Sequence, residues 1–216
     1  ALPATALHLS CYSKMFAGCT SLTQAPALPA LTMRAWCYEY MFQGCTSLTN
    51  APELPSTTLD KECYEYMFQG CTSLTTAPAL PATTLVYGCY QNMFKGCTAL
   101  TKAPDLPAVE LTDYCYYYMF YGCTKLNYVK ALFTTAPSAV GPEGTYVGAW
   151  LVDVSPTGTF IKNPDARWFR DKIGIPSGWT IKINGAVTPE PEPGPEQPTP
   201  EQDYLCFTST GDSTIS

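Results

Sequence analysis

Residues 37–59, CYEYMFQGCTSLTNAPELPSTTL, decide the fold because the chain repeats them. Residues 63–85, CYEYMFQGCTSLTTAPALPATTL, follow the same wording 26 positions later. The string Gly-Cys-Thr marks five such copies, which together run from residue 1 to about residue 133. The string begins at Gly18, Gly44, Gly70, Gly96 and Gly122. A fixed period of this length is typical of a solenoid, in which each copy buries its apolar side against its neighbours.

The first part of each copy predicts a short helix. On a wheel of about 100° per residue, Cys37, Tyr38, Met41 and Phe42 fall within an arc of ~140°. All five copies keep Cys, Tyr, Met and Phe at these positions, whereas the positions between them vary. We therefore expect residues 37–43 to form a helix of about two turns with these four side chains buried, ended by Gly44.

The second part of each copy predicts a short strand. Leu48, Ala51 and Leu54 are spaced to point inward, and two prolines limit the strand to a few residues because proline has no N–H to donate. We expect a strand over residues 48–51 that pairs with the same segment of the next copy at ~4.8 Å. The predicted fold class is an α/β solenoid of five 26-residue repeats, each a short strand plus a short helix.

The repeat wording also resembles a known family. Tyr-Met-Phe-x-Gly-Cys-Thr-Ser-Leu-Thr-x-Ala-Pro-x-Leu-Pro is similar to the BspA-like leucine-rich repeats of bacterial cell-surface proteins, over residues 1–133. The resemblance implies a right-handed leucine-rich repeat superhelix. It also implies an extracellular or cell-surface location, adhesion as the role and a host protein or glycan as the partner. It supplies no catalytic residues, and the asparagine ladder usual in leucine-rich repeats is not evident.

The chain after the array divides into three further parts. Residues 134–187 contain β-prone pieces at 146–154, 159–162 and 179–183, which predict a small β-rich C-terminal cap over the last repeat. Residues 188–203 alternate Pro and Glu, which predicts an extended linker. Residues 204–216 read as the start of a further module or as an added strand. The expected packing residues of the cap are Trp150, Phe160, Trp168 and Trp179.

Ten of the eleven cysteines stand in register in the repeats, and Cys206 stands outside them. We interpret them as two ladders of small buried side chains, although disulfides between some rungs of the Gly-Cys-Thr cysteines stay open. Their spacings do not suit zinc, which prefers pairs such as Cys-x-x-Cys. We expect no metal and no cofactor.

Two sets of residues are candidate binding surfaces. On the expected concave face, one column contains Gln24, Asn50, Thr76, Lys102 and Tyr128, and a second contains Ala27, Glu53, Ala79, Asp105 and Ala131. On the helical face the expected outward residues are tyrosines, whose rings suit contact with protein or carbohydrate: Tyr40, Tyr66, Tyr117, Tyr118 and Tyr121.

Composition and charge disfavour several classes of function. The net charge of -6 and the pI of about 4.7 do not suit nucleic acid. No apolar run is long enough to insert in a membrane. A catalytic cysteine would need a histidine base, and His8 is the single histidine. We predict a monomeric, non-enzymatic adhesion protein. The alternatives are a structural spacer and a surface hydrolase, for which Asp153, Asp165 and Asp171 in the cap would have to cluster.

Overall fold

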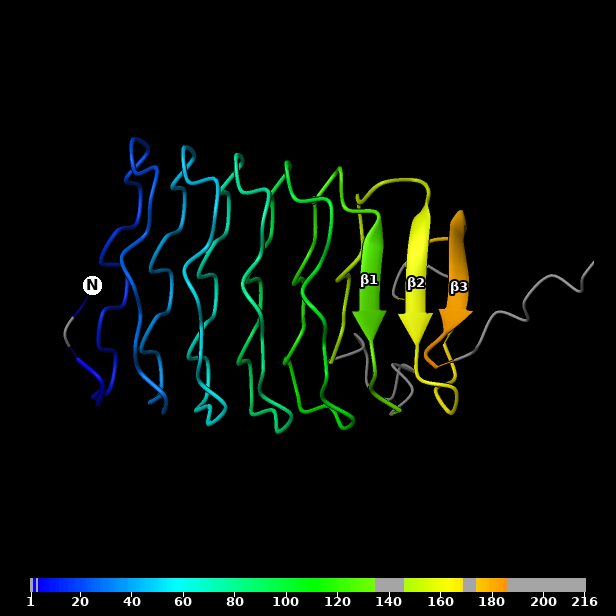
Figure 1. The fold of residues 1–216 in the computed structure, drawn as a ribbon, viewed down its shortest axis with the longest axis horizontal. Coiled ribbons are helices and arrows are strands. Elements are labelled where there is room, and N and C mark those ends of the chain that lie inside the picture. The colour runs from blue at the N-terminus through cyan, green and yellow to red at the C-terminus, as the bar shows by residue number, and fades with distance from the viewer. Residues whose placement is uncertain (1, 3, 135–145, 169–173, 186–216) are drawn as a thin grey trace, which may run out of the picture. The chain divides into compact units, whose positions relative to one another are not determined.

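The computed structural model describes residues 2, 4–134, 146–168 and 174–185. Residues 1–186 form one compact unit. The predicted linker at 188–203 and the predicted module at 204–216 lie outside the described residues. In the compact unit the chain winds through successive parallel rungs, as the solenoid prediction requires (Figure 1). We number rungs 1 to 5 by their glycines, Gly18, Gly44, Gly70, Gly96 and Gly122.

The predicted helix is wrong, because the structure describes no helix and residues 37–43 form consecutive turns. Every fourth residue of this segment has a positive φ: 57° at Trp36, 54° at Tyr40 and 70° at Gly44. A left-handed residue in each turn interrupts the α-helical bonds. The N–H groups of Met41 and Gln43 instead donate to the carbonyls three residues back, at 3.2 and 3.1 Å. We call the side of the solenoid built from residues 36–44 and their counterparts the turn face.

The remaining N–H groups of the turn face bond to the next rung. Tyr38, Tyr40 and Phe42 donate to the carbonyls of Cys63, Glu65 and Met67, each at 2.9 Å. The same pattern recurs at every junction from rung 1 to rung 5, and it always runs from a rung to the following one. These bonds hold neighbouring rungs closer than helices about 10 Å wide could approach. The turn chain therefore replaces the helix and still satisfies its backbone.

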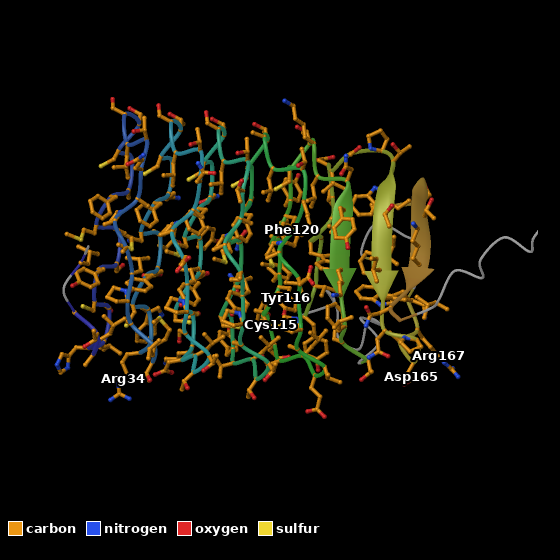
Figure 2. All side chains as sticks on the ribbon, in the orientation of Figure 1. Arg34, Cys115, Tyr116, Phe120, Asp165 and Arg167 are labelled. Atoms are coloured by element: carbon orange, nitrogen blue, oxygen red, sulfur yellow. The ribbon has the colours of Figure 1, made fainter. Side chains whose placement is uncertain are left out.

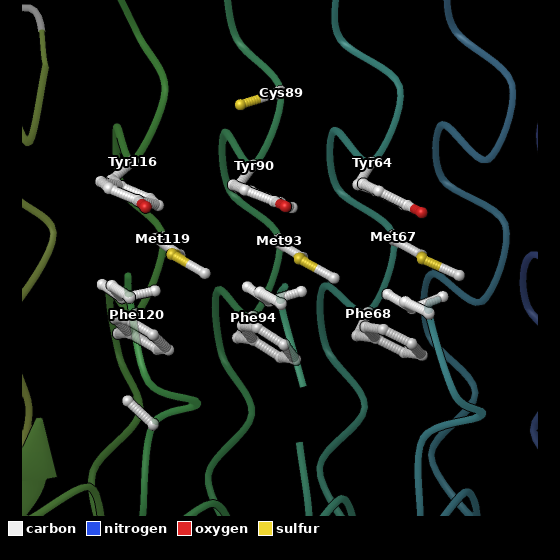
Figure 3. Packing of buried hydrophobic residues seen from close by; sticks show 14 of the residues in the cluster. Tyr64, Met67, Phe68, Cys89, Tyr90, Met93, Phe94, Tyr116, Met119 and Phe120 are labelled. Carbon is white, nitrogen blue, oxygen red and sulfur yellow. The ribbon is translucent and has the colours of Figure 1, made fainter. Parts of the chain in front are cut away.

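The core lies between the turn face and the opposite side, and it consists of rows that run along the solenoid. Figure 3 shows one row with Tyr64, Tyr90 and Tyr116, a second with Met67, Met93 and Met119, and a third with Phe68, Phe94 and Phe120. Successive phenylalanine rings stack with centroids 5.6 to 5.7 Å apart. The four positions predicted to be buried are confirmed as buried in rungs 2 to 5.

The side opposite the turn face, residues 48–55 and their counterparts, is the strand face. In rungs 1 to 4 the predicted strands shrink to single bridges, such as Asn50 to Thr76. Longer strands follow: β1 (Tyr128–Ala131), β2 (Gly158–Lys162) and β3 (Trp179–Ile183) form a parallel sheet in the order β1-β2-β3 (Figure 1). The difference follows the sequence, because the Ala-Pro of the earlier rungs gives way to Val129-Lys130 in β1.

The cap contains a sixth rung, which the 26-residue repeat does not predict. Residues 146–154, predicted to be β-prone, instead form turns at the start of this rung, with positive φ at Ala149 and Asp153. They accept the turn-face bonds of rung 5, for example from Phe120 N–H to the Trp150 carbonyl at 3.0 Å. The predicted strands near 159–162 and 179–183 are confirmed as β2 and β3. The predicted packing residues are confirmed in the core, three fully buried and Trp168 partly.

Candidate binding faces

The residues of the first predicted column lie in register on the strand face. Parallel bridges join Gln24 to Asn50, Asn50 to Thr76 and Lys102 to Tyr128. The side chains are exposed, except that Tyr128 is half-buried. The Lys102 ammonium lies 5.0 Å from the centre of the Tyr128 ring, a cation–π contact that holds both side chains on the surface. The column therefore presents hydroxyl, amide, ammonium and phenol groups in one row.

A shallow hollow of about 340 Å³ lies beside this column, between rungs 3 and 4. Its floor includes Pro78 and Pro104. Because proline has no N–H, these two residues donate no hydrogen bond to a neighbouring rung. Thr76, Lys102 and Asp105 line the hollow as well. An apolar floor with a few polar groups at its edge is the usual composition of a small-ligand site.

The second predicted column is correct only in part. Glu53 and Asp105 are exposed as predicted, but Ala131 is buried and pairs with Leu106. Rung 5 is one residue shorter than rung 4 between the two bridges, so the register shifts by one. Lys130 takes the surface position instead and forms an ion pair with Asp105 at 2.8 Å. The shift could be anticipated only from the loss of Ala-Pro in rung 5.

The predicted tyrosines lie on the turn face in two groups. Tyr40 and Tyr66 stack with ring centroids 4.5 Å apart. Tyr118 contacts Tyr117 at 4.5 Å and Tyr121 at 5.2 Å. All five rings are half-buried rather than fully outward. The two groups are separate because the column that contains Tyr66 and Tyr118 has Asn92 in rung 4.

Two more tyrosines, which we did not predict from the sequence, belong to the second group. Tyr87 contacts Tyr114 at 5.4 Å, and Tyr114 contacts Tyr117 at 5.3 Å. Tyr87 is 47% exposed. The 26-residue register could have found both. It aligns Tyr87 with Lys61 and Tyr114 with Glu62, two charged residues of rung 3, and Tyr114 has a positive φ as Tyr118 does.

A buried carboxyl group lies between the two tyrosine groups. Glu65 is only 8% exposed, and its Oε1 accepts a bond from Gln91 Nε2 at 2.8 Å. Burial, together with the neighbouring carboxylates Glu62 and Glu39, raises the pKa of Glu65 to about 7. Glu65 therefore changes its charge near neutral pH.

We expect this carboxyl group to make stability depend on pH. The pKa of Glu65 is about 7 in the folded state and 4.5 without the shift. Between pH 4.5 and pH 7 the folded chain therefore binds a proton that the unfolded chain has lost. The contribution of Glu65 to stability is greatest below pH 4.5, falls as the pH rises to about 7 and stays lower above it. Glu65→Gln should remove this fall and raise the free energy of unfolding at pH 8 by about 2 kcal/mol, which is less than the full shift because an amide acceptor bonds Gln91 more weakly.

Urea denaturation at pH 4.5 and pH 8 measures this effect. Glu53→Gln is the matched control, because Glu53 is exposed and its removal changes the net charge equally. Equal pH profiles for Glu65→Gln and the unsubstituted chain would show that Glu65 titrates normally.

The repeat cysteines form the two predicted ladders. In rungs 2 to 5 all are buried. Cys71, Cys97 and Cys123 donate their Sγ–H to the carbonyls of Phe42, Phe68 and Phe94, at 3.0 to 3.1 Å. These thiols therefore join each rung to the rung before it. Burial raises the pKa of Cys71 to about 12, so the thiol stays protonated and able to donate.

Two of the three carboxylates that a hydrolase would need in the cap lie among the described residues. Asp153 and Asp165 are exposed, and Asp171 lies outside the described residues. Across residues 4–134, 146–168 and 174–185, no three His, Cys, Asp or Glu side chains lie close enough to hold a metal ion. In the same part of the chain the structure has no helix with the length and hydropathy of a membrane span.

Comparison with known proteins identifies the repeat. Residues 9–127 match the model of the BspA type leucine-rich repeat region, in six copies. No curated protein and no solved structure matches the chain. The match covers more than half of the 216 residues, and it includes the turn chain, the cysteine ladders and most of the strand face. The chain therefore belongs to the BspA-type leucine-rich repeat family.

Proposed function

We propose that this chain is a monomeric, non-enzymatic binding module, located outside the cell or on its surface, that adheres to a host protein or glycan through the strand face. The repeat family supports the location and the adhesive role, since the sequence resembles bacterial cell-surface proteins of this type. The strand face supplies the residues we assign to binding.

The observation that carries the proposal is the contrast between a constant core and a varied strand face. The core rows keep the same residue types in rungs 2 to 5, whereas the column from Gln24 to Tyr128 changes residue at every rung. Solenoid proteins present such surfaces on a scaffold whose rungs contact only their neighbours. The hollow beside Lys102 adds a concave place in which part of a ligand can be desolvated.

Immobilised protein should bind at least one of three probe sets: mucin, extracellular-matrix proteins or a glycan array. We expect saturable binding that falls at least tenfold when Asn50, Lys102, Asp105 and Tyr128 are all changed to alanine. A turn-face variant with Tyr117, Tyr118 and Tyr121 changed to alanine is the matched control, and it should bind as well as the unsubstituted chain.

Each other outcome contradicts the proposal in a distinct way. Loss of binding only in the turn-face variant would assign the interaction to the tyrosines. Absence of binding to every probe would favour a structural spacer that holds other modules.

A further inference from the structure

A cluster of hydrogen-bond acceptors lies on the turn face around Gly88, away from the strand-face site. Rungs 1, 2, 3 and 5 have Ser10, Trp36, Glu62 and Tyr114 at the position that Gly88 occupies in rung 4. Because Gly88 has no side chain, Glu62 extends over it. A Cβ atom on Gly88 would lie only 2.8 Å from Glu62 Cγ. Glycine at this position therefore makes room for the Glu62 side chain, whose Cγ packs against rung 4.

Besides the Trp36 N–H, which donates to Glu62, the groups near the Glu62 side chain are acceptors and aromatic rings. Gln91 uses its Nε2 for Glu65, which leaves Gln91 Oε1 as the amide atom near Gly88, 3.7 Å from the position of a Cβ there. The rings of Tyr87 and Tyr114 stand at 61° to one another with centroids 5.4 Å apart. We call Glu62, Glu65, Tyr87, Gln91 and Tyr114 the Gly88 patch.

The Gly88 patch has no cation of its own within the described residues. No Lys or Arg lies within 4.0 Å of the Glu62 or Glu65 carboxylates there. Glu62 accepts only a neutral donor in that part of the chain, Trp36 Nε1 at 2.5 Å. Burial raises the pKa of the Tyr87 phenol, and Glu62 and Glu65 raise it further, which reflects a negative potential at this ring.

Elsewhere the turn face binds its own ammonium groups through aromatic rings. Lys61 lies 4.4 Å from the centre of the Trp36 ring, Lys14 lies 4.9 Å from that of Tyr40, and Lys95 lies 5.0 Å from that of Tyr118. In the described chain no such lysine covers Tyr87 or Tyr114. Two rings inclined at 61°, beside carboxylate and amide oxygens, are a suitable set for a protonated amine or guanidinium.

We propose that the Gly88 patch binds a lysine or arginine side chain presented by a basic segment of a partner protein. The cation contacts the faces of Tyr87 and Tyr114 and donates hydrogen bonds to the Glu62 carboxylate and to Gln91 Oε1. This interaction is independent of the strand-face site, so the two can be tested separately. A basic partner segment also complements the net negative charge of the chain.

Calorimetric titration with a trilysine peptide, at pH 8 and low salt, tests the proposal on the full chain. We expect saturable binding that weakens at least tenfold when the three side-chain amines are acetylated. Glu62→Gln and Tyr87→Ala should each weaken trilysine binding at least fivefold, with thermal melting close to that of the unsubstituted chain. The strand-face variant should bind trilysine unchanged, which separates this result from a failure of the proposed adhesive function.

Asp165→Asn is the matched control, because it removes one carboxylate from an exposed position in the cap, where the side chain points outward (Figure 2). We expect trilysine binding within twofold of the unsubstituted chain for this variant. An equal loss with Asp165→Asn and Glu62→Gln would show attraction to net charge alone and would overturn the proposal. Absence of trilysine binding to the unsubstituted chain would overturn it as well.

Discussion

Phe94→Ala should lower the free energy of unfolding by about 4 kcal/mol, the largest effect we expect from a single substitution. The Phe94 ring is fully buried and stacks on Phe68 at 5.6 Å and on Phe120 at 5.7 Å. Alanine removes both stacking contacts and leaves a cavity that the neighbouring rungs cannot close, because inter-rung hydrogen bonds hold their spacing. Urea denaturation followed by circular dichroism measures the loss.

Leu31→Ala is the control for this substitution. Leu31 is 63% exposed, so removing its side chain should change stability by less than about 0.5 kcal/mol. If Phe94→Ala cost no more than Leu31→Ala, the row of phenylalanines would not be the core of the solenoid.

Gly158→Ala should lower the free energy of unfolding by about 3 kcal/mol. Gly158 begins β2, and a Cβ atom there would lie 2.5 Å from the Asn127 carbonyl oxygen and 2.8 Å from Trp179 Cε2. The carbonyl cannot move aside without losing the bond that it accepts from Thr159 N–H at 2.8 Å. The methyl group therefore separates β2 from the preceding rung or displaces the buried Trp179.

A second glycine separates this close approach from backbone strain. Gly18 has a φ of 74° and no atom within 4 Å of an added Cβ, so Gly18→Ala costs only the left-handed strain of about 1 kcal/mol. Thermal melting of the two variants compares them directly. A loss for Gly158→Ala that merely equals that of Gly18→Ala would mean that the strands separate easily.

The buried positions were predictable from the sequence, whereas the conformation that buries them was not. A helix of 3.6 residues per turn and a turn chain with a period of four both place Cys37, Tyr38, Met41 and Phe42 inward, so the hydrophobic pattern cannot separate them. Rung 4 has the distinguishing signal, since Gly88, Asn92 and Gly96 are residue types that tolerate positive φ, spaced by four. In the other rungs the third site is also glycine, but the first two are Ser10 and Lys14, Trp36 and Tyr40, Glu62 and Tyr66, or Tyr114 and Tyr118, and bonds to the next rung offset the strain.

The strand-face column was predictable for a similar reason. A constant period of 26 fixes which residues lie side by side, whatever the local backbone does, and it correctly placed Asn50, Thr76 and Lys102. It failed at Ala131, where one residue is missing, and at the sixth rung, which begins after an insertion and follows rung 5 at a spacing of 31 rather than 26. The tyrosine contacts depend on ring orientation, about which the repeat period contains no information.

The one-way bonding of the turn face gives the solenoid an electrical polarity. Every inter-rung bond there points its N–H toward the following rung, so peptide dipoles of about 3.5 D add along the axis instead of cancelling. On the turn face each unit thus has one edge of acceptors and one edge of donors. Two acceptor edges cannot join. Whole 26-residue units, however, can be gained or lost by duplication and deletion without changing either edge, so the length of such an array can vary freely in evolution while its chemistry stays the same.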